Sequence, residues 1–338
     1  MGNPWDYDFS AIGQRTAPLL IVHGSDHDAT AKVGATGFKV GGNSDIYQLL
    51  PSSLQVDQLN MSKQFLQATG RPDPKRYPVV LNLCTDPDQH PRTLERIGKL
   101  LRGFKGRLIN KPEAVLRTTR DQVARRLSGI DGLHVPKIVR LRNPKPGAAS
   151  VSSQKAGQSY PLIVRRAGTH MGKVIGVVND AAELDAAAVG EGEFFLIEFV
   201  DFRSGDGLYR KYRLWSFGGR TIFRHLVVTD NWNVHVSERL RFMLDRPDLM
   251  DEEKRLLTRL DGNFPSSVHA TFDAVKKKIG LDFFGMDFGF GWDGQMILFE
   301  ANATMNFFPL FANPRFAYLE KILQPAQDAL RMMIQPDR

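Results

Sequence analysis

The first third of the chain alternates short apolar runs with a helical repeat. Residues 18–23 (PLLIVH) and 77–84 (YPVVLNLC) have the apolar content of buried strands, and turn-forming residues follow each of them. Residues 91–104 repeat apolar side chains along one helical face, and 107–109 form another short apolar run. Strand, turn, helix and strand in this order predict an α/β unit with parallel strands, which ends near residue 113.

The middle of the chain mixes helices, strands and a polar segment. The segment NPKPGAASVSSQKAGQSY, residues 143–160, is rich in Pro, Gly and Ser and lacks periodicity, which predicts a surface loop. The other elements that we expect here are helices over 119–130 and 181–188 and strands over 135–141, 161–165 and 194–200.

The last part of the chain has the pattern of two β-hairpins. Strands are expected at 212–217 and 221–228 around Gly-Gly-Arg, and at 283–290 and 295–300 around Gly-Trp-Asp-Gly. Helices are expected over 251–260 and 266–279. A closing helix has an apolar stripe, formed by Leu319, Ile322, Leu323, Ala326 and Leu330.

Composition narrows the class of protein. The chain has 338 residues, a formal net charge of +8, 24% charged residues and a single cysteine, Cys84. No apolar run approaches the ~20 residues of a membrane span, and no signal peptide is evident, so we expect a cytoplasmic protein without membrane contact. Basic residues are scattered among acids, which disfavours nucleic acid and favours small anionic ligands that carry phosphate. A homodimer is compatible with this composition.

Three oxygen-bearing side chains surround the second hairpin. Asp287 precedes its turn, and Glu300 and Asn302 follow it in the string LFEANA. Residues on the two strands of an antiparallel hairpin can lie opposite each other with their side chains on one face. Two carboxylates and an amide oxygen suit Mg²⁺ that also binds phosphate. The competing interpretation is a pair of carboxylates held by arginine or by backbone donors.

A basic strand end precedes a glycine-containing turn. In PLIVRRAGTHMGK, Arg165 closes the strand, and Gly168, Thr169 and Gly172 follow. Backbone N–H groups of such a turn can bind phosphate, and His170 could contact phosphate or substrate. The string is neither a P-loop nor a GxGxxG fingerprint.

The first hairpin has a third cluster of charge. Lys211 and Arg213 point the same way on a strand, and Arg224 lies on the next one. A phosphate-binding face and a solvated hairpin face are both consistent with this segment.

Taken in order, these strings resemble the ATP-grasp superfamily, over about residues 109–310. The nearest branch holds the D-alanine–D-alanine ligases, glutathione synthetases and RimK-type ligases. The strings that carry the resemblance are INKPEAVLRTTRD, PLIVRRAGTHMGK, FFLIEFV, YRLWSFGGR and FGMDFGF with LFEANA. The resemblance implies an α/β fold in which two subdomains, residues 114–192 (the lid) and 193–338, clasp ATP. An N-terminal parallel-sheet domain, residues 1–113, precedes them.

The resemblance also implies roles for individual residues. Asp287, Glu300 and Asn302 match ligands of Mg²⁺, for which Mn²⁺ can substitute. Arg165 matches a phosphate-binding lysine, and the turn from Gly168 to Gly172 matches a mobile loop over the phosphates. The residues implied to contact adenine are Ile163, Phe299 and the hinge residues Glu198, Phe199 and Val200. Arg213 and Arg224 fall where cationic catalytic residues meet phosphate and the substrate carboxylate.

Some positions depart from the family pattern. Gln122 stands where a second phosphate-binding lysine is expected, Lys211 stands where many relatives have Asp, and Ala-Thr-Met-Asn follows Asn302 in place of Pro-Gly. The activity implied is an ATP-dependent carboxylate–amine ligase that works through an acyl phosphate on amino-acid or other small carboxylate substrates. The alternatives are a small-molecule kinase on the same scaffold and a degenerate module that binds nucleotide without turnover.

Overall fold

The computed structural model describes residues 19–27, 32–34, 37–168, 174–259 and 262–335. The predictions for Thr169, His170 and Gly172 lie outside these residues. Among the described residues, no helix combines the length and the apolarity that crossing a bilayer would need.

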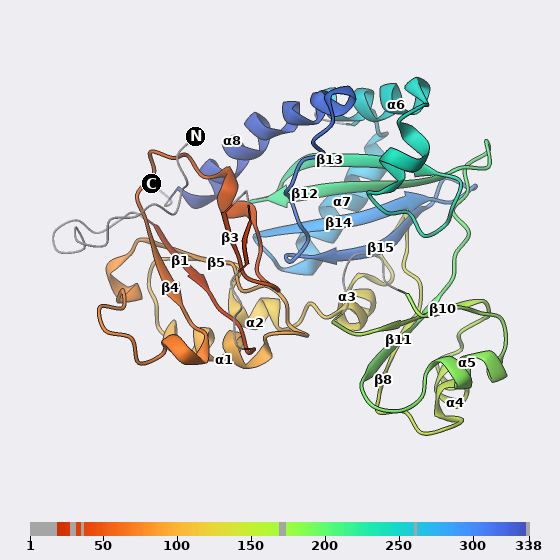
Figure 1. Ribbon diagram of the computed structural model, residues 1–338, viewed down its shortest axis with the longest axis horizontal. Helices are drawn as coiled ribbons and strands as arrows, with labels where there is room; N and C mark the ends of the chain where they lie inside the picture. The colour runs from red at the N-terminus through yellow and green to blue at the C-terminus, as the bar shows by residue number, and fades with distance from the viewer. Residues whose placement is uncertain (1–18, 28–31, 35–36, 169–173, 260–261, 336–338) are drawn as a thin grey trace.

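The N-terminal part is built on a four-stranded parallel sheet (Figure 1). Its order is β4 (Val56–Asn60), β1 (Leu19–His23), β5 (Val79–Asn82) and β6 (Arg107–Ile109). Leu20, Val22 and Val80 are fully buried, as continuous apolar runs in a parallel sheet require. The further elements of this part are β2 (Lys32–Gly34), β3 (Gly37–Lys39), α1 (Pro91–Leu100), α2 (Pro112–Val115) and 3₁₀ helices at Ile46–Leu49, Lys63–Phe65 and Pro74–Arg76. The predicted α/β unit with parallel strands is confirmed.

An antiparallel sheet with a hydrophobic core of its own contains strands β8 to β11, residues 138–198, and is called the lid below. Its order is β10 (Gly176–Val178), β9 (Leu162–Arg166), β11 (Glu193–Glu198) and β8 (Ile138–Arg142). Two helices, α4 (Ala148–Lys155) and α5 (Ala181–Ala187), contribute side chains to its core. Figure 1 shows the lid as a lobe apart from the larger sheets.

The prediction of a structureless loop over 143–160 is wrong, because α4 occupies its centre. The backbone of Gly147 is left-handed (φ 77°) and starts the helix, which then buries Ala149 and Ser153. Asp185 of α5 accepts hydrogen bonds from the backbone N–H and the hydroxyl of Ser150. Tertiary contacts, rather than an apolar stripe, stabilise this helix. The sequence of the segment therefore shows little helical periodicity.

A five-stranded sheet forms the rest of the structure. Its order is β13 (Arg220–Thr229), β12 (Tyr209–Phe217), β14 (Phe283–Phe290), β15 (Met296–Asn302) and β7 (Leu133–His134). The remaining elements are α3 (Arg120–Leu127), a π-helical turn (Arg239–Met243), α6 (Pro247–Thr258), α7 (Ser266–Ile279), a 3₁₀ helix (Pro314–Ile322) and α8 (Leu323–Ile334). Both predicted hairpins are present, as β12–β13 and β14–β15.

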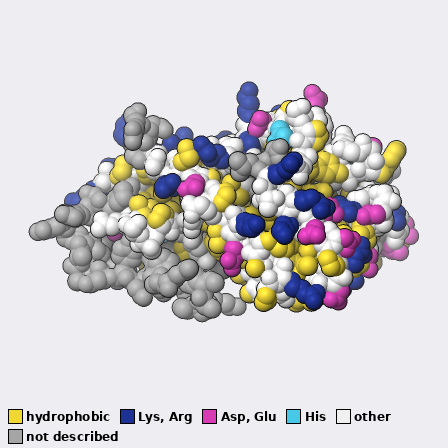
Figure 2. All heavy atoms as spheres, turned by 90° about the horizontal axis from the view of Figure 1, so that it is seen from above, with side chains coloured by type: hydrophobic (Ala, Val, Ile, Leu, Met, Phe, Trp, Pro, Cys, Tyr) yellow, Lys and Arg dark blue, Asp and Glu magenta, His cyan; other side chains and the backbone are white. Residues whose placement is uncertain are grey.

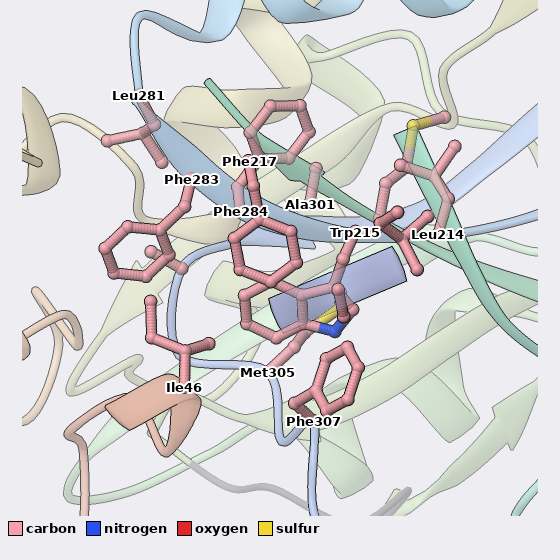
Figure 3. Packing of buried hydrophobic residues seen from close by; sticks show 14 of the residues in the cluster. Ile46, Leu214, Trp215, Phe217, Leu281, Phe283, Phe284, Ala301, Met305 and Phe307 are labelled. Atoms are coloured by element: carbon pink, nitrogen blue, oxygen red, sulfur yellow. The ribbon is translucent and has the colours of Figure 1, made fainter. Parts of the chain in front are cut away.

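The N-terminal sheet and the five-stranded sheet share one hydrophobic core. Figure 3 shows Ile46 of the N-terminal part in one cluster with Trp215, Phe217 and Phe307. Asn110 joins the same two parts, because its side-chain oxygen accepts the N–H groups of Asp282 and Phe283, at 2.7 and 3.1 Å. The lid core is a separate cluster, so the lid packs as an independent unit beside a larger two-sheet body.

Candidate functional site

A row of polar side chains crosses one face of the five-stranded sheet. The strand register places His225 of β13 beside Arg213 of β12, then Asp287 of β14, then Glu300 of β15. Cross-strand partners share a face, so these four side chains project from the sheet together. The prediction that Asp287 and Glu300 lie opposite each other is therefore confirmed.

Asp287 is held by two cations. Arg213 Nε lies 2.6 Å from Oδ1 of Asp287, and Nη2 lies 2.8 Å from Oδ2, which is a bidentate pair. Lys211 Nζ lies 3.8 Å from Oδ2. Burial is the largest single effect on the pKa of the Asp287 carboxyl and would raise it. The charge and hydrogen bonds of Arg213, together with the charges of Lys211 and Arg120, outweigh burial and lower that pKa. Asp287 is therefore an ionised carboxylate.

Glu300 is held differently. Its Oε1 lies 2.8 Å from Arg120 Nη2 and accepts a hydrogen bond from the amide of Asn302, at 2.9 Å. Burial acts to raise the pKa of Glu300, and Arg120 and Arg165 lower it below its ordinary value. The amide oxygen of Asn302 accepts the N–H groups of Thr304 and Met305, both at 2.9 Å. These bonds fix the chain as it leaves β15.

The lid presents a matching face. Leu162 and Val164 of β9 are buried in the lid core, so the alternate residues Ile163 and Arg165 point to the opposite face. In register, Arg165 lies beside Phe195, and Ile163 lies beside Ile197. Burial, helped by the charge of Arg120 and opposed by that of Glu300, lowers the pKa of Arg165 to about 10. A basic row and an apolar row therefore lie next to each other on this face.

A cavity lies between the lid and the larger body. Arg120, Arg165, Glu300 and Asn302 are among the residues that line it. The N-terminal part contributes Asp86 and Asp88, and Gly168 and Phe299 also lie in its wall. All three parts of the structure thus border one charged cavity.

The hinge residues lie at a second and more open hollow. Glu198, Phe199 and Val200 border this hollow, together with Tyr160 and Trp292. The carboxylate of Glu198 accepts the backbone N–H groups of Lys137 and Ser159, at 3.1 and 3.2 Å, so that side chain is committed to the lid. Ile163 is not among the residues that line either hollow.

Arg224 contacts backbone rather than the charged cavity. It is 5% exposed. Its Nε donates to the carbonyl of Phe307 at 2.7 Å, and its Nη2 donates to that of Pro309 at 3.1 Å. From the N-terminal part, Asp45 accepts the N–H groups of Phe307 and Phe308, at 2.8 and 3.0 Å. Arg224 therefore fixes the segment that follows Asn302, which is a different placement from the phosphate contact that the resemblance implies.

Arg120 is a site residue that the sequence interpretation missed. Gln122 stands at the position expected for a second lysine, but its amide lies against the backbone carbonyls of Leu116 and Arg117. Arg120, two residues earlier, reaches Glu300 and also donates to the carbonyl of Phe299, at 2.8 Å. The family motif could not indicate that Arg120, rather than residue 122, reaches the cavity, because a side chain at the first turn of α3 approaches the cavity from a different angle.

A divalent cation that brings phosphate with it would have to displace existing contacts here, because Arg213 binds both oxygens of Asp287 and the amide oxygen of Asn302 accepts two backbone N–H groups. Asp287, Glu300 and Asn302 supply hard oxygen atoms from adjacent strands, which is the chemistry that Mg²⁺ prefers. Among the described residues, no group of three His, Cys, Asp or Glu side chains could hold a metal ion. Phosphate oxygens would therefore have to complete the coordination.

Several solved structures resemble this one along nearly its whole length. They are VanG D-Ala:D-Ser ligase from Enterococcus faecalis (12% identity, TM-score 0.53, 95% of this chain and 100% of that chain), D-alanyl-alanine synthetase A from Vibrio cholerae (13%, 0.54, 94% and 100%) and the ATP-grasp ligase PsnB with a minimal precursor (12%, 0.53, 95% and 100%). No protein-family model matches the sequence, and a search of curated proteins finds no match. The likeness is thus one of structure, and the chain has the fold of the ATP-grasp superfamily.

Proposed function

We propose that this protein is an ATP-dependent ligase that joins a carboxylate to an amine through an acyl phosphate. The observation that carries the proposal is the charged cavity between lid and body, where Arg165 and Arg120 face the carboxylate of Glu300. Reactions at a γ-phosphate depend on positioning and on neutralising charge, rather than on a nucleophilic side chain. The ligases of the same fold named above support the reaction class.

The adenine would lie between the two parts of the fold. Phe299 offers a ring on β15, and the backbone of residues 198–200 would form the hinge edge. Ile163 lines neither hollow in this structure and would have to become exposed on the lid face that carries Arg165 to contact adenine. Phe299 packs against Phe202 with ring centroids 4.6 Å apart, which fixes its orientation. The triphosphate would then extend toward Arg165 and Arg120.

In the first step, the substrate carboxylate attacks the γ-phosphorus, and the bond to the β–γ bridging oxygen breaks to release ADP. In the second step, the amine attacks the acyl carbon, the bond to phosphate breaks, and the amine gives up a proton. Glu300 and Asn302, with Asp287 beside them, would hold Mg²⁺, which would supply positive charge to the phosphate oxygens. Arg165 and Arg213 neutralise the charge that develops on oxygen. The lid keeps water from the acyl phosphate.

The test is product analysis with a panel of amino acids and small carboxylates. A ligase releases ADP and free phosphate, and hydroxylamine added in place of the amine traps the acyl phosphate as a hydroxamate. Glu300→Gln keeps the size of the side chain and removes its charge, so we expect turnover to fall by about 10²-fold or more. Glu252→Gln is the matched control, because Glu252 also pairs with an arginine, Arg210, and lies outside the charged cavity.

Two outcomes would replace this proposal. A stable phosphorylated product with no free phosphate would indicate a small-molecule kinase. Nucleotide binding without turnover over the whole panel, unchanged in Glu300→Gln, would indicate a binding module.

A further inference from the structure

The chain leaves β15 through residues 303–309, which are called the exit segment below. The first part of this segment borders the charged cavity, because Asn302 accepts the N–H groups of Thr304 and Met305, and Thr304 lies in the cavity wall. The second part enters the shared hydrophobic core, where Phe307 is fully buried (Figure 3). Buried backbone N–H and C=O groups need partners, so the contacts of this segment show what holds it in place.

Two consecutive peptide groups of the exit segment are each held at both ends by charged side chains. The first group joins Asn306 to Phe307. Its N–H donates to Oδ1 of Asp45 at 2.8 Å, and its carbonyl accepts from Nη1 of Arg213 at 3.3 Å. The second is the next peptide group along the chain. Its N–H donates to Oδ2 of Asp45 at 3.0 Å, and its carbonyl accepts from Nε of Arg224 at 2.7 Å. One carboxylate therefore binds the N–H end of each group, and a guanidinium binds each carbonyl end.

The first of these peptide groups links Asp45 to Arg213. A peptide group is planar and rigid, so a displacement of its N–H end also moves its carbonyl end. Arg213 in turn binds both oxygens of Asp287. Burial acts to lower the pKa of Arg213, and the charges of Asp287, Glu300 and Asp45 raise that pKa above its ordinary value. Asp45 therefore acts on Arg213 both through the backbone and through its charge.

Asp45 has a fixed position in the N-terminal part. Its exposed fraction is 1%, and it stands directly before the 3₁₀ helix Ile46–Leu49, whose first and last side chains are fully buried in the core shared with the five-stranded sheet. The two guanidinium groups come instead from strands β12 and β13. The exit segment is therefore clamped between the N-terminal part and the five-stranded sheet.

We infer that Asp45 is a positioning residue: it holds the peptide group between Asn306 and Phe307, and this group orients the guanidinium of Arg213. Asp45 itself is not among the residues that line the charged cavity, so the N-terminal part acts on the site through buried backbone. The consequence for turnover rests on the proposed function, in which Arg213 neutralises the charge that develops on oxygen. A displaced guanidinium would do so less well.

The first experiment needs no ligand. With ¹⁵N-labelled arginine, the Nε–H resonance of Arg213 is assigned by its loss in Arg213→Lys, and it reports on the contact of this group with Asp287. Asp45→Asn keeps the size of the side chain and removes its charge, so one of the two N–H groups loses its acceptor. This variant should shift the Arg213 resonance and speed hydrogen exchange in the exit segment about tenfold or more.

Asp282→Asn is the matched control. Asp282 also joins the N-terminal part to the five-stranded sheet by accepting a backbone N–H, that of Asn110 at 2.7 Å, and it lies outside the exit segment. This control should leave the Arg213 resonance and the exchange of the exit segment unchanged. If Asp45→Asn does not fold, Arg213→Lys tests the same link from its other end and should also speed exchange in the exit segment.

The second experiment measures ADP release from ATP with the panel of amino acids and small carboxylates used above. Asp45→Asn should lower kcat about tenfold and keep KM for ATP within about threefold of the wild-type value, because Asp45 orients a group that acts in the transition state. Asp282→Asn should keep both constants within about twofold of the wild-type values.

The outcomes separate this inference from the ligase proposal. An unchanged Arg213 resonance in Asp45→Asn, equal changes in Asp282→Asn, or unchanged exchange in Arg213→Lys would overturn the inference and leave the ligase proposal standing. Equal losses of kcat in Asp45→Asn and Asp282→Asn would overturn the positioning role of Asp45. A shifted resonance in Asp45→Asn, together with a wild-type protein that releases no ADP over the whole panel, would overturn the ligase proposal and support the link between Asp45 and Arg213.

Discussion

At the scale of single residues, burial is tolerated where a charge has a partner. Asp287 is buried and ionised because Arg213 grips both of its oxygens. The sequence indicated that Asp287 and Glu300 would face each other, since hairpin spacing is local. It left open whether metal or arginine would meet them, and the structure shows arginine on each carboxylate. Arg120 is 180 positions from Glu300, and no local pattern encodes that distance.

His225 predicts a pH dependence of stability. Burial, reinforced by Arg213, lowers the pKa of this imidazole well below its ordinary value, so it is neutral in the folded protein. The unfolded chain takes up a proton at this residue as the pH falls below about 6.5, and the folded protein does not. Acid therefore favours unfolding, by about 1.4 kcal/mol for each pH unit below that value.

The measurement for His225 is the unfolding free energy from urea titrations at pH 7.0, 6.0 and 5.0. His225→Gln should reduce the loss of stability on acidification, and His27→Gln, which changes an exposed imidazole, should not. Equal pH slopes in the wild type and in His225→Gln would contradict the argument.

At the scale of elements, the glycines of strand β14 allow neighbouring side chains to pack closely beside Asp287. Gly285 and Gly289 flank Asp287 on the same face. A Cβ at Gly285 would lie 2.8 Å from the sulfur of Met305, and one at Gly289 would lie 2.7 Å from Cζ of Phe299. The alternation of large apolar residues and small ones in FFGMDFGF was visible in the sequence. Its reason was not, because Met305 and Phe299 approach the strand only in the folded sheet.

Gly289→Ala should therefore disturb the proposed nucleotide site through Phe299. The added methyl also meets the backbone carbonyl of Arg210 at 3.0 Å, so it cannot be accommodated by moving the ring alone. We expect a loss of about 1–3 kcal/mol in stability and a roughly tenfold weaker affinity for adenine nucleotide, measured by calorimetry. Gly176→Ala, in lid strand β10, is the control, since nothing lies within 4 Å of its Cβ position. Equal affinities in the two variants would argue against a role for Phe299 in adenine binding.

At the scale of the whole molecule, surface charge is mixed, and the hydrophobic core is divided between the body and the lid. The +8 net charge does not gather on the face seen in Figure 2, where Lys and Arg side chains are mixed with Asp and Glu. Inside, one core joins two sheets, and the lid has its own. Sequence patterns predicted most strands of the three larger sheets, because strand signals are local. They could not predict how the lid is tied to the body, since those contacts join residues far apart in the chain.

Arg140 of lid strand β8 makes the main contact between the lid and the body. Its guanidinium contacts Asp88 of the N-terminal part at 2.5 Å, Asp121 of α3 at 3.1 Å and Glu193 of the lid at 2.5 Å, and it lies over the ring of Phe195, 4.6 Å from the centroid. Its side chain is 12% exposed, so water screens these contacts weakly. A second contact joins the amide of Gln89 to the carbonyl of Gly168, at 3.3 Å. Arg140 therefore sets the position of the lid over the cavity.

We expect Arg140→Met to destabilise the docking of the lid on the body by about 3–5 kcal/mol, because it leaves Asp88 and Asp121 without their shared buried partner. A double-mutant cycle with Asp88→Asn isolates the contact between lid and body, and the coupling should be about 1–3 kcal/mol. Arg142→Met is the matched control, since Arg142 pairs with Glu193 and its side chain is 72% exposed. Hydrogen exchange locates the effect: Arg140→Met should speed exchange in β8 to β11 and leave the β1–β5 core unchanged, because the lid core is separate. Uniform acceleration over all three sheets would mean that Arg140 supports global stability rather than the position of the lid.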